Sequence, residues 1–308
     1  MGSPVHFSAW TTDSRTAKRA FEAGFGEFDR LDRAMSVWRA GSDILRLNAA
    51  AGDHPVTVSA DVRDALHIAR QVSEWTDGKF DVTFGALGDL WKFDENQDNR
   101  IPDRADVLRR LPLIDYTTVE VNDAAGTAFV RRKGAQVNLG GIGKGYAVDR
   151  AAAALRAAGL RDFMIQAGGD LYVAGHRDGR PWRLGIRDPR GPAGTSFAAI
   201  DLSDATFSTS GDYERFFMHD GRRYHHILDP DTGEPARLTR SVTMVTGRAV
   251  MADALAKGVF ILGPEAGMAL VERLPDVEAV IVGADNTVRV SSGLTGRLVQ
   301  LAPPTDAP

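Results

Sequence analysis

Apolar residues recur at three- and four-residue steps in several segments, and this spacing predicts amphipathic helices. One such segment follows Asp13 and Ser14, either of which can cap the first turn. A second runs from about Ser59 to Trp75, and a third is expected over Ala147–Ala158, ended by Gly159. The apolar positions of the first helix are Phe21, Phe25, Phe28, Leu31 and Met35. Because they share one face, we expect them to contribute to the core.

Short runs rich in β-branched and aromatic residues, bounded by turn residues, predict strands in the second half of the chain. These runs are Phe163–Gln166, Leu171–Ala174, Trp182–Ile186, Ala198–Leu202, Ala205–Ser208, Thr243–Thr246, Ala279–Val282 and Val288–Val290. Two mostly apolar helices, Ala252–Leu262 and Glu265–Leu274, precede the last two strands. Earlier, Val119–Val121 and Ala128–Arg131 alternate around a turn and predict a hairpin. Because strands and helices do not alternate in a regular βαβ series, the pattern favours an α+β fold.

A glycine-rich stretch, VNLGGIGKGYAVDR from Val137 to Arg150, leads into the third expected helix. Its glycines allow a backbone to approach a ligand closely, and the N–H groups at a helix start attract anions. The spacing matches neither the dinucleotide fingerprint nor the P-loop. Two interpretations therefore stay open here: a loop that binds phosphate, and an ordinary tight turn between a strand and a helix.

Composition narrows the class of protein. The chain has 308 residues, 43% of them hydrophobic and 25% charged, as is typical of a globular protein. We expect one domain over residues 1–308, with two interleaved subdomains as the alternative. The net charge of −4 argues against a general binder of nucleic acid, and the absence of cysteine excludes disulfides and thiolate metal sites. We find no apolar run of membrane-spanning length, and the N-terminal MGSPVHFSAW lacks the features of a signal peptide.

Two stretches carry side chains suited to acid–base or ionic chemistry. In YHHILDPDTGEP, His225 and His226 directly precede an Asp-Pro turn, and histidine exchanges protons near neutral pH. In MADALAKGVFILG, Asp253 and Lys257 stand four residues apart on one helix face. Each also has a structural interpretation: a histidine that binds a carbonyl in a turn, and an ordinary ion pair along a helix. These residues alone leave both interpretations open.

Seven stretches of this chain combine glycines, hydroxyls, aromatic rings and charges in a distinctive order. They are MSVWRAGSDILRLN, FDVTFGALGDLW, VNLGGIGKGYAVD, GGDLYVAG, FSTSGDY, HHILDPDTGEP and MADALAKGVFILG. In this order they resemble the FAD:protein FMN transferases, the ApbE-like flavin transferases, over nearly the whole chain. The resemblance implies an α+β, T-fold-related architecture of mixed sheets with packed helices, in which the flavin lies in a cleft between two halves.

The resemblance also implies an activity and a set of site residues. Such enzymes split FAD, place FMN on a threonine or serine of an acceptor protein through a phosphoester bond, and release AMP. Mg2+ assists near the pyrophosphate, and the matching positions for it here are the Gly141 carbonyl and Asp253. The positions that match the family's FAD-binding residues are Met1, Ser36, Val37, Trp38, Thr83, Phe84, Gly85, Asn138, Lys144 and Leu228. A periplasmic or cell-envelope location is implied as well.

The chain departs from the family pattern at the metal site. The family usually has Asp at the position of Asn138, Asp or Ser at that of Ala256, and Thr at that of Lys257. Because Mg2+ prefers oxygen ligands, the side chains of Ala256 and Lys257 contribute nothing to such a site. One hypothesis is that the Lys257 ammonium takes the place of Mg2+. The alternative is a protein that binds FAD, or cleaves it as an FAD pyrophosphatase, without transfer.

For the chemistry itself we expect His226, Asp253 and Lys257 to be the catalytic residues. His226 is placed to contact the phosphate region or to assist proton transfer. His225, its neighbour, is expected to face outward.

Overall fold

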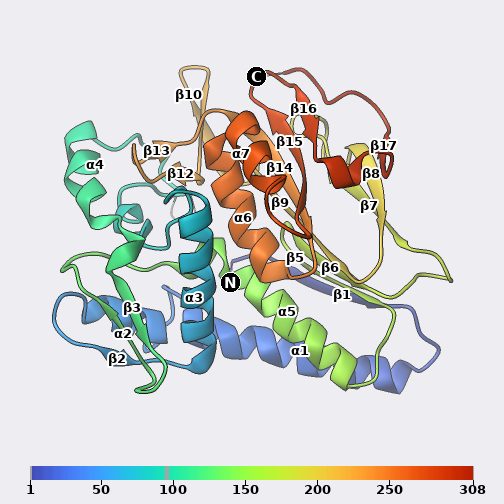
Figure 1. Cartoon of the computed structure of the whole chain (residues 1–308), viewed down its shortest axis with the longest axis horizontal. Coiled ribbons are helices and arrows are strands. Elements are labelled where there is room, and N and C mark those ends of the chain that lie inside the picture. The colour runs from blue at the N-terminus through green and yellow to red at the C-terminus, as the bar shows by residue number, and fades with distance from the viewer. Residues whose placement is uncertain (1, 94–96, 308) are drawn as a thin grey trace.

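A central sheet of seven strands organises the molecule (Figure 1). The computed structural model describes residues 2–93 and 97–307. Side by side, the strands are β1 (Val5–Ala9), β5 (Phe163–Ala167), β6 (Asp170–Ala174), β9 (Ala205–Gly211), β14 (Thr239–Thr246), β15 (Glu278–Gly283) and β16 (Val288–Val290). Neighbouring strands of this sheet run antiparallel. Strand β14 is buried along its whole length, because layers of the protein pack on both faces of the sheet.

Helices cover one face of the sheet. They are α1 (Ser14–Met35), α5 (Gly143–Ala157), α6 (Ala249–Leu262) and α7 (Pro264–Val271). The predicted cap of α1 is confirmed, since Asp13 accepts hydrogen bonds from the backbone of Arg15 and Thr16. Phe28 and Leu31 of its apolar face lie in the main core. Within the described part of the chain, no helix combines the length and the apolar content that a membrane span requires.

A three-stranded sheet covers the opposite face. Its strands, in the order β17-β8-β7, are β17 (Leu298–Gln300), β8 (Ser196–Leu202) and β7 (Trp182–Arg187). Alternate residues of β7 are buried and exposed, so Trp182, Leu184 and Ile186 pack against the central sheet. The molecule therefore has helices, a large sheet and a small sheet in successive layers, and the predicted α+β class is confirmed.

The remaining elements lie beside these layers. The helices among them are α2 (Asp43–Ala49), α3 (Ala60–Trp75) and α4 (Arg104–Arg110). A second three-stranded sheet has the order β2 (Val56–Thr57), β4 (Thr127–Val130), β3 (Val119–Asn122). Two hairpins pair β10 (Phe216–His219) with β11 (Arg222–His225) and β12 (Leu228–Asp229) with β13 (Glu234–Pro235). The predicted helix after Ser59 and the predicted hairpin, now β3 and β4, are both confirmed. Of the predicted FAD-binding residues, these elements contain Leu228, the first residue of β12.

Helix α5 begins earlier than predicted, at Gly143 instead of Ala147. The prediction treated the glycines as a loop, since glycine disfavours helix. In the structure, however, α5 crosses α6 so closely that a Cβ on Gly145 would lie 2.2 Å from the Ala249 carbonyl oxygen. Glycine is required at this helical position by packing.

Candidate functional site

Two aspartates and two lysines from three separate elements meet near the start of α5. Lys144 is the second residue of α5, Asp170 begins β6, and Asp253 and Lys257 lie one turn apart in α6. The Lys144 Nζ lies 2.9 Å from Asp170 Oδ2 and 3.5 Å from Asp253 Oδ1. The Lys257 ammonium donates to the same Asp253 Oδ1. We call these four residues the charged cluster.

Both carboxylates of the charged cluster are buried and accept further hydrogen bonds. Asp253 is fully buried, and its Oδ2 accepts a hydrogen bond of 2.8 Å from the Gly145 N–H. Asp170 is 2% exposed, and its Oδ1 accepts from the Ser208 hydroxyl. Burial alone would raise the pKa of Asp170, but the positive charges of the two lysines outweigh burial and hold that pKa below its ordinary value. Asp170 is therefore ionised at neutral pH.

The two lysines are the more accessible side chains of the charged cluster. The side chains of Lys144 and Lys257 are 22% and 17% exposed, whereas those of Asp170 and Asp253 are 2% and 0% exposed. Burial alone would lower the pKa of Lys144, but its two carboxylate neighbours raise that pKa above its ordinary value. An anion that approaches from solvent therefore meets positive charge first.

Two of the predicted FAD-binding segments pack directly on each other. The Asn138 N–H donates to the Val82 carbonyl at 2.7 Å, and the Asn138 side chain accepts from the Gly140 N–H at 2.8 Å. A Cβ on Gly85 would lie 2.5 Å from the Gln136 carbonyl oxygen. These contacts fix the glycine-rich turn and the FDVTFG segment as one unit at the start of α5.

The Thr83 hydroxyl serves the fold of its own loop. It donates to Asp81 Oδ1 at 2.6 Å and accepts from the Asp115 N–H at 2.7 Å, and Thr83 is fully buried. The next residue, Phe84, is half-buried. Of these two side chains, Phe84 is therefore the accessible one.

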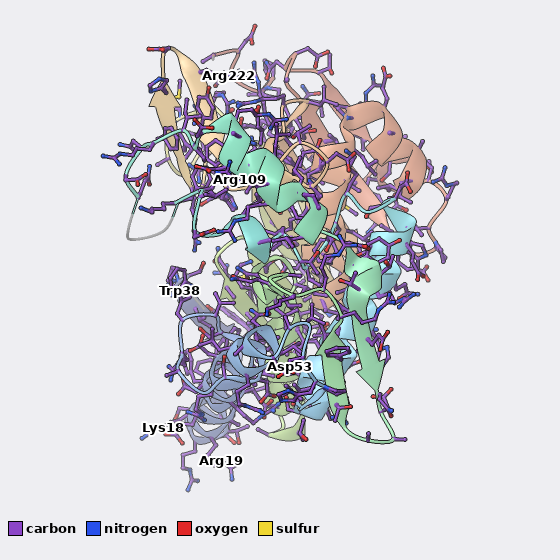
Figure 2. The ribbon with its side chains drawn as sticks, turned by 90° about the vertical axis from the view of Figure 1, so that its left-hand side faces the viewer. Lys18, Arg19, Trp38, Asp53, Arg109 and Arg222 are labelled. Atoms are coloured by element: carbon purple, nitrogen blue, oxygen red, sulfur yellow. The ribbon has the colours of Figure 1, made fainter. Side chains whose placement is uncertain are left out.

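Other predicted FAD-binding residues lie farther along the surface. Ser36, Val37 and Trp38 directly follow α1, and the Ser36 hydroxyl accepts from the Trp38 N–H at 3.1 Å. Trp38 is 72% exposed, and Figure 2 shows its side chain at the surface. Leu228 is instead buried in an aromatic cluster beside the β10–β11 hairpin. Met1 lies outside the described residues.

The prediction that His225 faces outward is wrong. His225 is 2% exposed, its Nε2 lies 2.8 Å from the Ala236 carbonyl oxygen, and its Nδ1 lies 3.3 Å from the Ile227 N–H. The ring also packs edge-on against Phe260. Burial lowers the pKa of His225 to about 4. The imidazole satisfies backbone groups that the turn would otherwise leave unpaired, so its role is structural.

His226 is half-buried, and the positive charge of Lys257 is among the causes that lower its pKa. Its backbone N–H donates to the Arg215 carbonyl at 3.1 Å. Burial lowers the pKa of His226 to about 3, helped by the positive charges of His225, Arg215 and Lys257. The ring is therefore neutral at physiological pH.

The side chains of the charged cluster do not fit Mg2+, which requires oxygen ligands in near-octahedral geometry. Each oxygen of Asp253 already accepts from an N–H donor, and Ala256 presents only a buried methyl group. Between residues 2 and 93 and between 97 and 307, no three His, Cys, Asp or Glu side chains are grouped so as to hold a metal ion. A metal at Gly141 and Asp253 stays a prediction.

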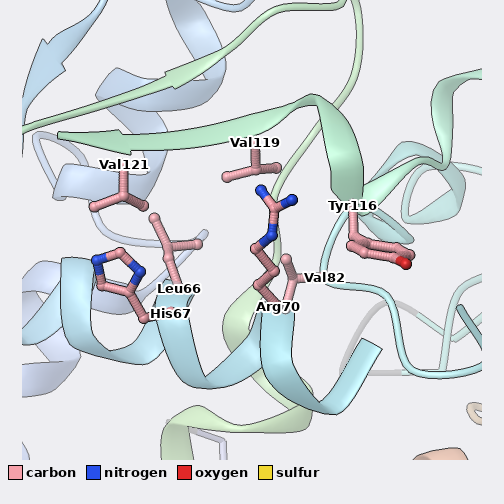
Figure 3. Close-up of a pocket in the computed structure, with 7 residues that line it drawn as sticks. All are labelled: Leu66, His67, Arg70, Val82, Tyr116, Val119 and Val121. Atoms are coloured by element: carbon pink, nitrogen blue, oxygen red, sulfur yellow. The ribbon is translucent and has the colours of Figure 1, made fainter. Parts of the chain in front are cut away.

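A small crevice opens between α3 and β3 (Figure 3). Its volume is about 100 Å³, and His67 and Arg70 from α3 face Val119 and Tyr116 across it. Pockets for drug-sized ligands have about 300–1,000 Å³. The crevice is therefore too small for FAD.

Sequence reasoning assigned no role to Asp170 or Ser208. Both lie in stretches that carry the family resemblance, GGDLYVAG and FSTSGDY. One signal was available: Asp170 is an acid at the start of an apolar strand, directly after two glycines. Since a buried carboxylate needs a partner, such a position indicates a nearby cation, which is Lys144.

Comparisons with known proteins agree on one family. A sequence model described as the ApbE family matches residues 1–281. The chain is 32% identical over 293 residues to an FAD:protein FMN transferase of Klebsiella pneumoniae, covering 95% of this chain and 90% of that relative. The crystal structure of the ApbE protein of Thermotoga maritima matches with a TM-score of 0.86 and 33% identity, covering 96% of each chain. The flavin transferase ApbE of Vibrio cholerae matches with a TM-score of 0.83 and 27% identity, again over 96% of each chain.

Proposed function

Because the chain belongs to the ApbE family and transfers FMN from FAD to an acceptor protein, we propose that the charged cluster is where FAD is split. The observation that carries this proposal is the pair of half-buried lysines, Lys144 and Lys257, which form ion pairs with two buried carboxylates. Lysine binds phosphate as a compact point charge. The accessible positive side of the cluster therefore suits the anionic pyrophosphate of FAD.

In the proposed reaction, a threonine or serine hydroxyl of the acceptor attacks the phosphorus of the FMN half. A new O–P bond forms, the bond from that phosphorus to the bridging oxygen breaks, and AMP leaves with the bridging oxygen. The hydroxyl proton passes to the neutral ring of His226, which later releases it to solvent. Lys144 and Lys257 stabilise the negative charge that develops on the leaving phosphate, while Asp253 holds Lys257 in position.

The rest of FAD is proposed to lie along the segments that resemble the family's FAD-binding residues. Phe84 and Trp38 support this part of the proposal, because an accessible aromatic ring offers a flat apolar surface to a flavin or an adenine. The resemblance adds further residues to the same proposal: Met1, Ser36, Val37, Thr83, Gly85, Asn138 and Leu228. So does a periplasmic or cell-envelope location, which cell fractionation tests.

The transfer is tested by mixing the purified protein with FAD and an acceptor domain that carries a threonine. Intact-mass analysis should show one added FMN, with an equal amount of AMP released. A matched acceptor with valine in place of that threonine should gain no mass. AMP and free FMN without labelled acceptor would indicate a pyrophosphatase. FAD binding without AMP release would indicate a flavin-binding protein, and either result contradicts the proposal.

The role of His226 is tested by His226→Ala. Loss of a general base should lower the transfer rate by about 100-fold or more, while the melting temperature stays close to that of the parent. His219→Ala is the matched control, because His219 is 51% exposed on the neighbouring hairpin and should not affect the rate. A His226→Ala protein that transfers FMN at the parent rate would assign proton transfer to another group.

A further inference from the structure

The ammonium of Lys257 stands beside Asp253, where the family resemblance implies a divalent cation. It donates to Asp253 Oδ1, and the Lys144 Nζ lies 3.5 Å from the same oxygen. The other oxygen, Oδ2, accepts from the Gly145 N–H at 2.8 Å. A cation that binds Asp253 must therefore displace an ammonium group or the start of helix α5.

Helix α6 fixes Lys257 in this place. The spacing of four residues puts Lys257 and Asp253 on the same side of the helix. The side chain of Lys257 is only 17% exposed. It donates to Asp253, and its positive charge contributes to lowering the pKa of both Asp170 and His226.

We propose that the Lys257 ammonium replaces the divalent cation, so that this protein binds and cleaves FAD without Mg2+. This inference rests on the proposed function. An ammonium has three N–H donors, and Asp253 takes one of them, which leaves donors for phosphate oxygens. It supplies charge and hydrogen bonds but no metal coordination. Lys144 adds a second cation at the same accessible side.

The difference in burial between the carboxylates and the lysines supports this assignment. The two carboxylates are fully or nearly fully buried behind the lysines, so they compensate the lysine charges from within the protein. A site built for Mg2+ needs the reverse arrangement, with carboxylate oxygens directed at the ion. Here the groups that a phosphate meets are N–H donors.

The test is a set of titrations with the full chain, freed of metal and flavin. FAD is titrated by flavin fluorescence in EDTA and in Mg2+, and Mg2+ itself is titrated by calorimetry. We expect the Kd for FAD to agree within about twofold between the two conditions, with no heat of Mg2+ binding to the free protein. FMN transfer should proceed in EDTA. Tight FAD binding or transfer that appears only with Mg2+ would overturn the inference.

Variants of Lys257 test whether its charge, in the absence of Mg2+, contributes to FAD binding. Lys257→Met should weaken FAD binding in EDTA by about 10- to 100-fold, the value of hydrogen bonds to a charged group. Lys79→Met is the matched control, since Lys79 is 21% exposed and paired with Asp229 and Asp231, and it should keep the parent affinity. Equal affinity of Lys257→Met and parent would contradict the proposed contact.

The reverse design should restore metal dependence. Lys257→Thr, combined with Ala256→Asp and Asn138→Asp, should bind Mg2+ by calorimetry and require it for tight FAD binding. If the parent shows no transfer in any buffer, the proposed function fails, and the FAD and Mg2+ titrations still decide the inference. A parent that binds no FAD at all overturns both. A triple variant that behaves like the parent would also count against the replacement.

Discussion

Replacing Gly145 by alanine should force α5 and α6 apart at the charged cluster. A Cβ at this position would lie 2.2 Å from the Ala249 carbonyl oxygen and 2.6 Å from Asp253 Cβ, about 1 Å short of ordinary van der Waals contact. The neighbouring atoms are backbone and a fully buried side chain, so they have little freedom to move. The helices themselves must shift.

The expected cost follows from two terms. Overpacking a core costs about 1–3 kcal/mol, and loss of the Gly145 hydrogen bond to buried Asp253 adds about 1–3 kcal/mol. The better helix propensity of alanine returns up to about 1 kcal/mol. We therefore expect Gly145→Ala to lower the free energy of unfolding by about 2–4 kcal/mol.

Gly143→Ala is the matched control, because a Cβ on Gly143 meets its nearest atoms only at 3.9 Å. It lies in the same helix and should leave stability unchanged or slightly higher. Urea unfolding of both variants and the parent measures the difference. Because Gly145→Ala also moves Asp253, and with it Lys257, its folded fraction should transfer FMN more slowly than the parent. Equal stability of the two variants would refute the close-crossing argument.

Two further predictions concern buried charge. Asp170→Asn removes a buried ion-pair partner of Lys144, so it should lower the free energy of unfolding by about 3 kcal/mol and weaken FAD binding. An unchanged melting temperature and FAD affinity would contradict this prediction. Stability should also fall as pH drops from 6.5 towards 4, because the unfolded chain takes up a proton at His225 that the folded state, with a pKa of about 4, refuses. Urea unfolding across this range should show a flatter slope for His225→Gln, and an equal slope would refute the assignment.

Local patterns predicted the elements well. The cap at Asp13 and the hairpin of β3 and β4 depend on neighbouring residues, so spacing was enough. Family membership and FMN transfer are also confirmed. Phe25 is an exception: it shares the apolar spacing of α1 but is 43% exposed and stacks on Phe7 at 4.3 Å between ring centroids. A helical pattern gives the apolar face but not how far the core extends beneath it.

The assembly of the site could not be predicted in the same way. Lys144 and Asp253 were expected in the site through the resemblance, but the pairing of Lys144 with Asp170 depends on where β6 starts in the sheet. The orientation of His225 depends on a carbonyl eleven residues away, at Ala236. Such contacts arise from the tertiary fold, and spacing along the chain contains no direct signal for them.

The Gly145–Asp253 contact joins residues 108 positions apart, and this separation has a consequence for biosynthesis. During synthesis, Lys144 emerges long before Asp253, so a growing or truncated chain has no complete charged cluster. Contacts between residues far apart in the sequence form late in folding. Until they form, the incompletely folded domain is exposed to proteolysis and aggregation. A ligand stabilises only the state that binds it. FAD therefore protects finished chains from proteolysis but gives no protection to chains in which α6 has not yet docked.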